Sequence, residues 1–144
     1  MVSKVKESKD NMGYNALTLS TAANNTAFGA SALAACTTGT RNTAGGSQAL
    51  LTVATANDNT AFGYAALNLA TGASNSAFGS LCMDVVSTGA SNSGFGLSAL
   101  GALTTGSSNC AFGSSSLAAM TTGSNCTAMG TNAGASNTSG TVTA

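Results

Sequence analysis

The chain has 144 residues, with four basic and four acidic side chains, no histidine and no proline. Five of the eight charges lie in the first ten residues, so the remainder holds no basic cluster of the kind that binds nucleic acid. Without histidine, and with so few carboxylates, the sequence offers no nucleophile–base pair and no metal-ligand spacing. We therefore expect neither an enzyme nor a cofactor- or metal-binding protein.

Residues 1–10 are polar and of mixed charge, and we expect them to form a flexible lead or an anchor to another protein. They lack the apolar run and small-residue cleavage site of a signal peptide, and no later stretch resembles a membrane span. The expectation is synthesis in a cytosol, with no membrane insertion.

Residues 11–132 repeat one phrase, seen most clearly as Asn-Thr-Ala-Phe-Gly at residues 25–29. Its glycine recurs every 16 or 17 residues, at Gly13, Gly29, Gly46, Gly63, Gly79, Gly96, Gly113 and Gly130. All five phenylalanines directly precede such a glycine: Phe28, Phe62, Phe78, Phe95 and Phe112. A second apolar column follows four residues after the glycine, at Leu17, Leu33, Leu50, Leu67, Leu100 and Leu117, with Met83 in the remaining place.

This period is too short for a pair of helices and instead predicts an all-β fold, a parallel β-solenoid of about eight coils. Residues 25–28 alternate as a strand does, with Thr26 and Phe28 on one face and Asn25 and Ala27 on the other. We expect a second short strand at residues 32–34 and a return corner at Thr-Thr-Gly phrases such as 37–39. Stacked coils would place identical residues in columns. A coil this thin cannot bury every apolar column, so we expect one to be left for a partner chain.

Two parts of the repeat look irregular. Between Asn42 and Asp58, Gly45 stands where phenylalanine is expected, which predicts a weak or bulged coil. Residues 133–144 lose the apolar pattern and are expected to form a degenerate cap, a tip or a truncated continuation.

The four cysteines, Cys36, Cys82, Cys110 and Cys126, occupy different positions of the repeat. We expect reduced thiols that act as small hydrophobic side chains, with no structural disulfide.

The phrases NTAFGASALAACTTG, NTAFGYAALNLATG and NSGFGLSALGALTTG resemble the NTAIGYxALxxNTTG repeats of phage and giant-virus tail fibres. They are more distantly similar to the head repeats of trimeric autotransporter adhesins. The resemblance implies a left-handed β-roll and a side-by-side homotrimer. Phenylalanine replaces the family's isoleucine here, and no stretch resembles the adhesins' membrane anchor or stalk.

The leading hypothesis is a non-enzymatic structural or adhesive module of a virus particle: a tail fibre, spike or capsid decoration. Its partners would be copies of itself, other virion proteins, through residues 1–10, and a host-surface receptor. The receptor-binding residues are unknown; exposed residues outside the columns are the first to consider, such as Arg41, Asp58, Tyr64 and Asp84.

Two alternatives stay open. Threonine ranks that include Thr37, Thr71, Thr104 and Thr121 suggest an ice-binding solenoid, although these threonines run into glycine corners and we favour hydroxyls that bond to neighbouring backbone. Open β-edges suggest a self-assembling filament.

Overall fold

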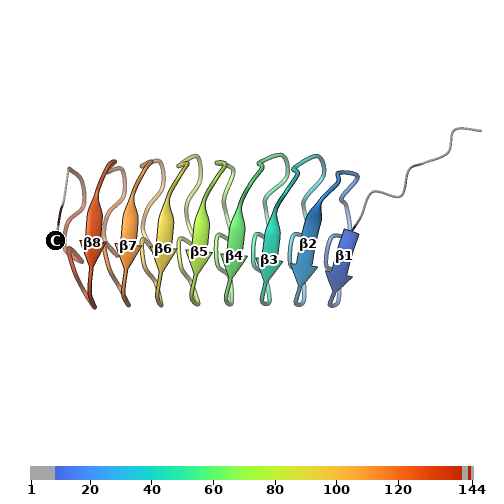
Figure 1. Ribbon diagram of the computed structural model, residues 1–144, viewed down its shortest axis with the longest axis horizontal. Helices are drawn as coiled ribbons and strands as arrows, with labels where there is room; N and C mark the ends of the chain where they lie inside the picture. The colour runs from blue at the N-terminus through green and yellow to red at the C-terminus, as the bar shows by residue number, and fades with distance from the viewer. Residues whose placement is uncertain (1–8, 141–142, 144) are drawn as a thin grey trace, which may run out of the picture.

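The computed structural model describes residues 9–140 and 143, and in them the fold is an all-β parallel solenoid (Figure 1). None of these residues lies in a helix. One sheet holds the strands in chain order, each parallel to the next. They are β1 (Lys9–Met12), β2 (Asn25–Phe28), β3 (Thr43–Gly45), β4 (Thr60–Phe62), β5 (Ser76–Phe78), β6 (Ser93–Phe95), β7 (Cys110–Phe112) and β8 (Thr127–Met129).

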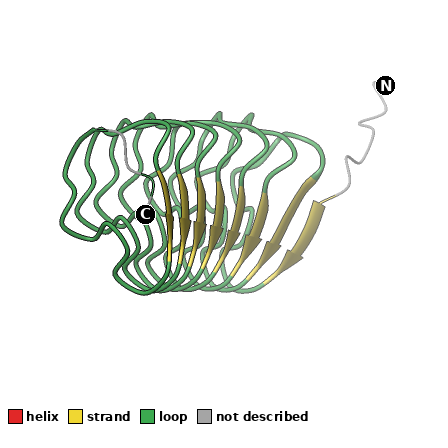
Figure 2. Ribbon diagram, turned by 60° about the vertical axis from the view of Figure 1, so that its left-hand side comes forward, coloured by secondary structure: helices red, strands yellow, loops and turns green. Residues whose placement is uncertain are grey.

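The strands form one wall of the solenoid, and turns and loops form the rest (Figure 2). Backbone groups bond from coil to coil, because each amide points along the long axis. The Thr26 amide donates to the Asn42 carbonyl at 2.9 Å, and the Gly29 amide donates back to Met12 at 2.7 Å. The predicted alternation in β2 is confirmed: Asn25 and Ala27 are buried, whereas Phe28 points outward.

The predicted second strand at residues 32–34 is wrong, because this segment is a turn. Ser31 and Leu33 have φ of 59° and 50°, in the left-handed region that breaks a strand. Every member of the leucine column, and Met83 with it, has φ between 49° and 52°. Each pays roughly 1–2 kcal/mol for that conformation. Burial of the side chain, worth about 1.5–3 kcal/mol, offsets the strain.

The recurring glycines form a corner where the backbones of successive coils touch. At Gly79, φ is 141°, and a Cβ would collide with the carbonyl oxygen of Gly96. The same overlap recurs from Gly13 to Gly113, and Gly130, at the last corner, shares the positive φ, which explains why glycine returns in every repeat.

The interior combines an apolar column with a polar ladder. The leucine column is buried together with the strand alanines and with Val53, Val86, Leu103 and Met120. Beside it lies an asparagine ladder, fully buried, made of Asn25, Asn42, Asn59, Asn75, Asn92 and Asn109. Each Oδ1 accepts a hydrogen bond from the backbone N–H at the same position of the next coil. Each Nδ2 donates to a corner carbonyl such as that of Gly39 or Gly89.

The coil between Asn42 and Asp58 is neither weak nor bulged, so that prediction is wrong. β3 pairs in register with both β2 and β4, and Asn42 occupies its place in the ladder. Gly45 simply leaves room for the Phe62 ring, which a Cβ at that position would meet.

A shorter repeat is accommodated at the Thr-Gly corner. Asn59 reaches Gly72 across 13 residues, where other ladder residues reach their carbonyl across 14. β4 and β5 nevertheless pair Thr60 with Ser76 in register.

The stacked coils extend past both predicted boundaries. β1 begins at Lys9, and the turns after Gly130 still bond to the previous coil, through Ala133, Ala135 and Thr138. Residues 1–8 of the predicted lead at 1–10, and residues 141, 142 and 144 of the predicted cap, lie outside the described residues; Lys9 and Asp10 belong to β1 instead.

Candidate interaction surface

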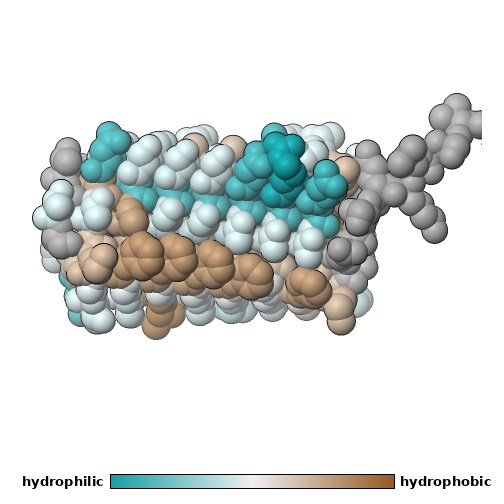
Figure 3. All heavy atoms as spheres, in the orientation of Figure 1, coloured by the Kyte–Doolittle hydropathy of each residue, from teal (hydrophilic) through white to brown (hydrophobic). Residues whose placement is uncertain are grey.

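The outward face of the sheet carries two parallel ranks of side chains. Alternation along each strand turns the first and third residue of the Thr-Ala-Phe phrase outward and buries the alanine. One rank is a brown stripe along the rod in Figure 3, and it contains the phenylalanines. The other is mostly Thr and Ser.

The phenylalanine ladder consists of Phe28, Phe62, Phe78, Phe95 and Phe112. The last four rings stack continuously, with centroid separations of 5.4, 5.0 and 4.4 Å along the chain and interplanar angles of 12° or less. Phe28, Phe62 and Phe112 are each 41% exposed and Phe78 is 37% exposed. Each interior ring shows an edge to solvent and its faces to other rings. The leucine column is thus inside the chain, while the phenylalanine column is on its surface.

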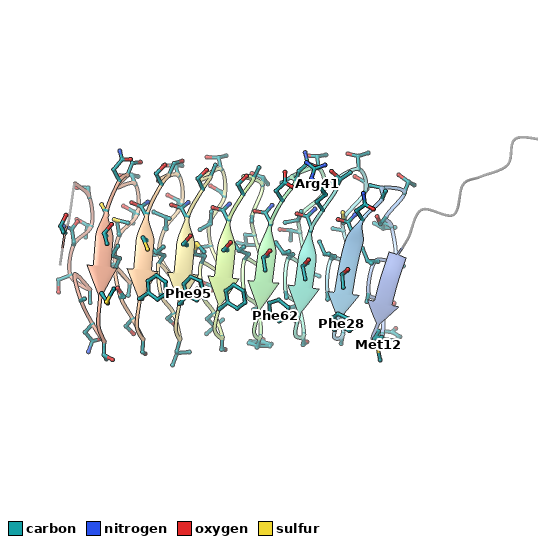
Figure 4. The ribbon with its side chains drawn as sticks, in the orientation of Figure 1. Met12, Phe28, Arg41, Phe62 and Phe95 are labelled. Carbon is teal, nitrogen blue, oxygen red and sulfur yellow. The ribbon has the colours of Figure 1, made fainter. Side chains whose placement is uncertain are left out.

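The ladder is interrupted once and extended at both ends. Gly45 leaves the gap between Phe28 and Phe62, and this is visible between the labelled rings in Figure 4. Met12 and Met129 continue the rank, at 68% and 73% exposure. Tyr64 and Leu97, just past the glycine corner, are also exposed. A long apolar strip therefore runs the length of the rod.

The hydroxyl rank consists of Thr26, Thr43, Thr60, Ser76 and Ser93, and Cys110 and Thr127 hold the same position in β7 and β8. The five hydroxyl side chains are half-buried. None of the five hydroxyls has a hydrogen-bond partner within the described part of the chain. Sequence reasoning placed Thr26 on the face of Phe28 but did not single out this rank.

The corner threonines behave differently. Thr37 Oγ1 donates to the Ala54 carbonyl at 3.1 Å, and Thr104 Oγ1 donates to Thr121 at 2.9 Å. Thr21, Thr71, Ser87 and Thr121 make the equivalent bond. The interpretation of these hydroxyls as bonded to neighbouring backbone is confirmed.

The charged side chains of the body bond within the chain. Arg41 and Asp58 are exposed and form a bidentate pair, with Nε–Oδ1 at 2.6 Å and Nη2–Oδ2 at 2.8 Å. This hydrogen bonding lowers the pKa of Asp58 and raises that of Arg41. Arg41 precedes β3, the strand with Gly45 in place of a ring, and Asp58 precedes β4, so the pair joins two coils between which ring stacking is missing. Figure 4 shows Arg41 on the edge of the rod remote from the rings.

Asp84 was expected to be exposed, and it is instead half-buried. Burial raises the pKa of Asp84, although hydrogen bonds from its own backbone amide and from that of Val85 act to lower it. Tyr64 is exposed, as expected.

All four cysteines are free thiols, and Cys36, Cys82 and Cys126 are buried. Burial raises the pKa of Cys82 to about 12, which keeps this thiol protonated and unreactive at neutral pH. Cys110 is only half-buried, because it lies on the outward face beside the phenylalanine ladder.

No group of three or more potential metal ligands occurs among the described residues, and they include no helix long and apolar enough to cross a membrane. Comparison with protein-family models, curated proteins and solved structures gives no match. The surface itself therefore carries the functional argument.

Proposed function

We propose that this protein is a non-enzymatic structural and adhesive module of a virus particle, a short shaft in a fibre, spike or capsid decoration. The proposed assembly is a side-by-side homotrimer of left-handed rods, each of about eight coils. Its location is the virion. The repeat phrases support this assignment through their resemblance to tail-fibre repeats.

The observation that carries the proposal is the uncovered phenylalanine ladder. A ring buries roughly 200 Å² when fully covered, so the four rings at 37–41% exposure leave on the order of 300 Å² of aromatic surface per chain, to which the half-buried Phe95 adds a smaller share. At about 25 cal/mol per Å², covering it is worth on the order of 10 kcal/mol per chain before the costs of association. The flanking methionines, Tyr64 and Leu97 bring the strip toward the roughly 800 Å² per partner of a standard interface.

The rod also has the properties of a spacer. Coil-to-coil bonding is continuous, the asparagine ladder is satisfied internally, and no charge cluster interrupts the outward face among residues 12–140. The length of such a rod increases with the number of coils, and each added coil contributes further contacts with its neighbour that stabilise the rod.

Light scattering coupled to size exclusion tests the assembly. We expect the wild-type protein to elute at three times the mass of one chain, and Phe78→Asp to reduce that mass, because it sets a carboxylate in the middle of the strip. Thr88→Asp is the matched control, since Thr88 is an exposed corner residue without a side-chain bond in the described chain. Ser107, another corner residue, is unsuitable because it is half-buried and its Oγ accepts a hydrogen bond from the Ala90 amide. A folded wild-type monomer refutes the trimer.

Immunogold electron microscopy tests the location. An antibody against the purified rod should label virus particles from the source. Labelling confined to host material would overturn the virion assignment even if the trimer forms.

A further inference from the structure

The two ends of the rod carry the backbone groups through which successive coils bond. Inside the rod, the amide of each recurring glycine donates to the previous coil, as Gly130 does to the Phe112 carbonyl at 2.7 Å, and the residue two positions later donates in the same direction. Other amides donate to the next coil, as Ala119 does to the Ala135 carbonyl at 3.1 Å. A terminal coil has a neighbour on one side only, so the groups on its other side are left for a partner.

These groups are complementary at the two ends, which lie at opposite ends of the long axis (Figure 1). The last coil offers two carbonyls and one amide, and the first coil offers two amides and one carbonyl at the matching repeat positions. None of these groups has a hydrogen-bond partner in the described chain. Translation along the axis by one rod length pairs Gly13 N–H with Met129 C=O, Asn15 N–H with Thr131 C=O, and Ser136 N–H with Thr18 C=O.

A buried side chain at the C-terminal end favours the same partner. Asn137 Oδ1 is buried and has no hydrogen-bond partner, the only side-chain atom of this kind among residues 9–140 and 143. Ser20 and Asn137 hold the two ends of an inner column, and Ser20 is also buried. The other members of the column are apolar and buried: Cys36, Val53, Ala70, Val86, Leu103 and Met120. Stacking places the Ser20 hydroxyl, which is a donor, next to Asn137 Oδ1, where an apolar residue would leave the acceptor unsatisfied.

Contacts between identical ends do not fit. Two identical ends meet with their strands antiparallel, which does not continue a parallel sheet. Two N-terminal ends would also bring together two copies of residues 1–10, each with three lysines and two carboxylates. Residues 126–140 have no charged side chain, so they do not repel that segment.

We infer that a second copy of this chain covers the C-terminal end, head to tail, so that its first coil continues the solenoid and the rods join into a longer filament. The open edge of β8 already accepts a parallel partner, because Thr143 bridges Thr127 there; β1 of the next copy takes that place in the stack. This inference goes beyond the proposed function and does not rest on it, since a single rod and a trimer of rods present the same ends.

Cysteine crosslinking across the junction tests the arrangement. Leu19 and Ser136 are exposed and hold the same repeat position in the first and last coils. A stack brings them one coil apart, about 4.8 Å, which a disulfide can span. Within one rod, or between parallel rods that lie side by side in register, they are seven coils apart, roughly 34 Å.

The experiment mixes ¹⁵N-labelled Leu19→Cys with unlabelled Ser136→Cys, both in the Cys110→Ser background, and oxidises the mixture with diamide. Diamide takes two protons and two electrons from each pair of thiols, so that a disulfide forms. The other three cysteines are buried and do not compete. We expect intact-mass measurement to find a linked dimer of one labelled and one unlabelled chain. The matched control is labelled Leu69→Cys, an exposed leucine at the same repeat position in the middle of the rod, which should not link to Ser136→Cys.

The double variant Leu19→Cys/Ser136→Cys separates the remaining arrangements on a non-reducing gel. A head-to-tail stack gives a ladder of linked dimers, trimers and longer species that collapses on reduction. Dimers without longer species would establish an antiparallel side-by-side pair and overturn the inference. It is also overturned if the mixed dimer is absent at high protein concentration while both variants keep the circular dichroism of the wild type. A trimer by light scattering would stand in that case, so the two proposals fail separately.

Discussion

Removal of one amide from the asparagine ladder should destabilise the rod far more than loss of a surface asparagine. We choose Asn75→Ala, in the middle of the chain, where the side chain is fully buried. Asn75 Oδ1 accepts from the Asn92 amide at 3.0 Å, and its Nδ2 donates to the Gly89 carbonyl at 2.9 Å.

The substitution leaves two buried backbone groups, the Asn92 N–H and the Gly89 C=O, without those partners. At roughly 1–3 kcal/mol for each unsatisfied group, we expect a loss of about 2–6 kcal/mol. That is a large part of the stability of an ordinary domain, about 5–15 kcal/mol. Asn92 Nδ2 also loses one of its two acceptors, although it keeps Gly106.

Urea unfolding followed by circular dichroism measures the loss. The matched control is Asn68→Ala in the same repeat, because Asn68 is half-buried and its side chain has no hydrogen bond in the described chain. We expect this control to change stability by less than about 0.5 kcal/mol, as most substitutions outside such networks do. Equal unfolding midpoints for the two variants would refute the ladder as a source of stability.

Two further predictions follow from the corner and from the half-buried carboxylate. Gly79→Ala should be among the most damaging small substitutions, seen as a large fall in melting temperature or soluble yield, because its Cβ would strike the Gly96 backbone at a φ of 141°. Gly101→Ala should be mild, since other repeats have Ala34 and Ala118 at this position; equal effects would contradict the close-contact explanation. For Asp84, a folded-state pKa above the unfolded value means that ionisation opposes folding, so the penalty is absent below the unfolded pKa and grows as pH rises through the folded pKa. Asp84→Asn should therefore raise the melting temperature at pH 7 and match the wild type in strong acid; an unchanged temperature at pH 7 would refute the desolvation argument.

The solenoid and the identity of its columns could be predicted from the sequence because the repeat restricts both. A period of 16 or 17 residues excludes helical pairs, and alternation in Asn-Thr-Ala-Phe assigns the two faces of each strand. The stacking of identical residues in columns was also foreseen, though the two-way hydrogen bonding of the asparagine column was not.

The errors have a common physical cause. Ala32-Leu33-Ala34 reads as a strand because local propensity cannot reveal that leucine will accept a left-handed φ of 50° when burial compensates for it. Gly45 reads as a defect because the sequence does not show that the Phe62 ring lies across it. Likewise, pattern alone does not tell which apolar column stays outside or which hydroxyls lack partners, since both depend on how the turns close each coil.

The way in which a shorter repeat is absorbed has a practical consequence. The repeat that contains Gly72 is one residue shorter at this corner. Asn59 Nδ2 still donates to the Gly72 carbonyl at 3.0 Å, and β4 and β5 stay in register. Length differences are thus confined to the turn at one edge of the rod, while the buried ladder keeps its bonds and the sheet face keeps its register. That edge is where foreign peptides could be inserted at defined intervals along one line, which would make the rod a scaffold for displaying epitopes in a row.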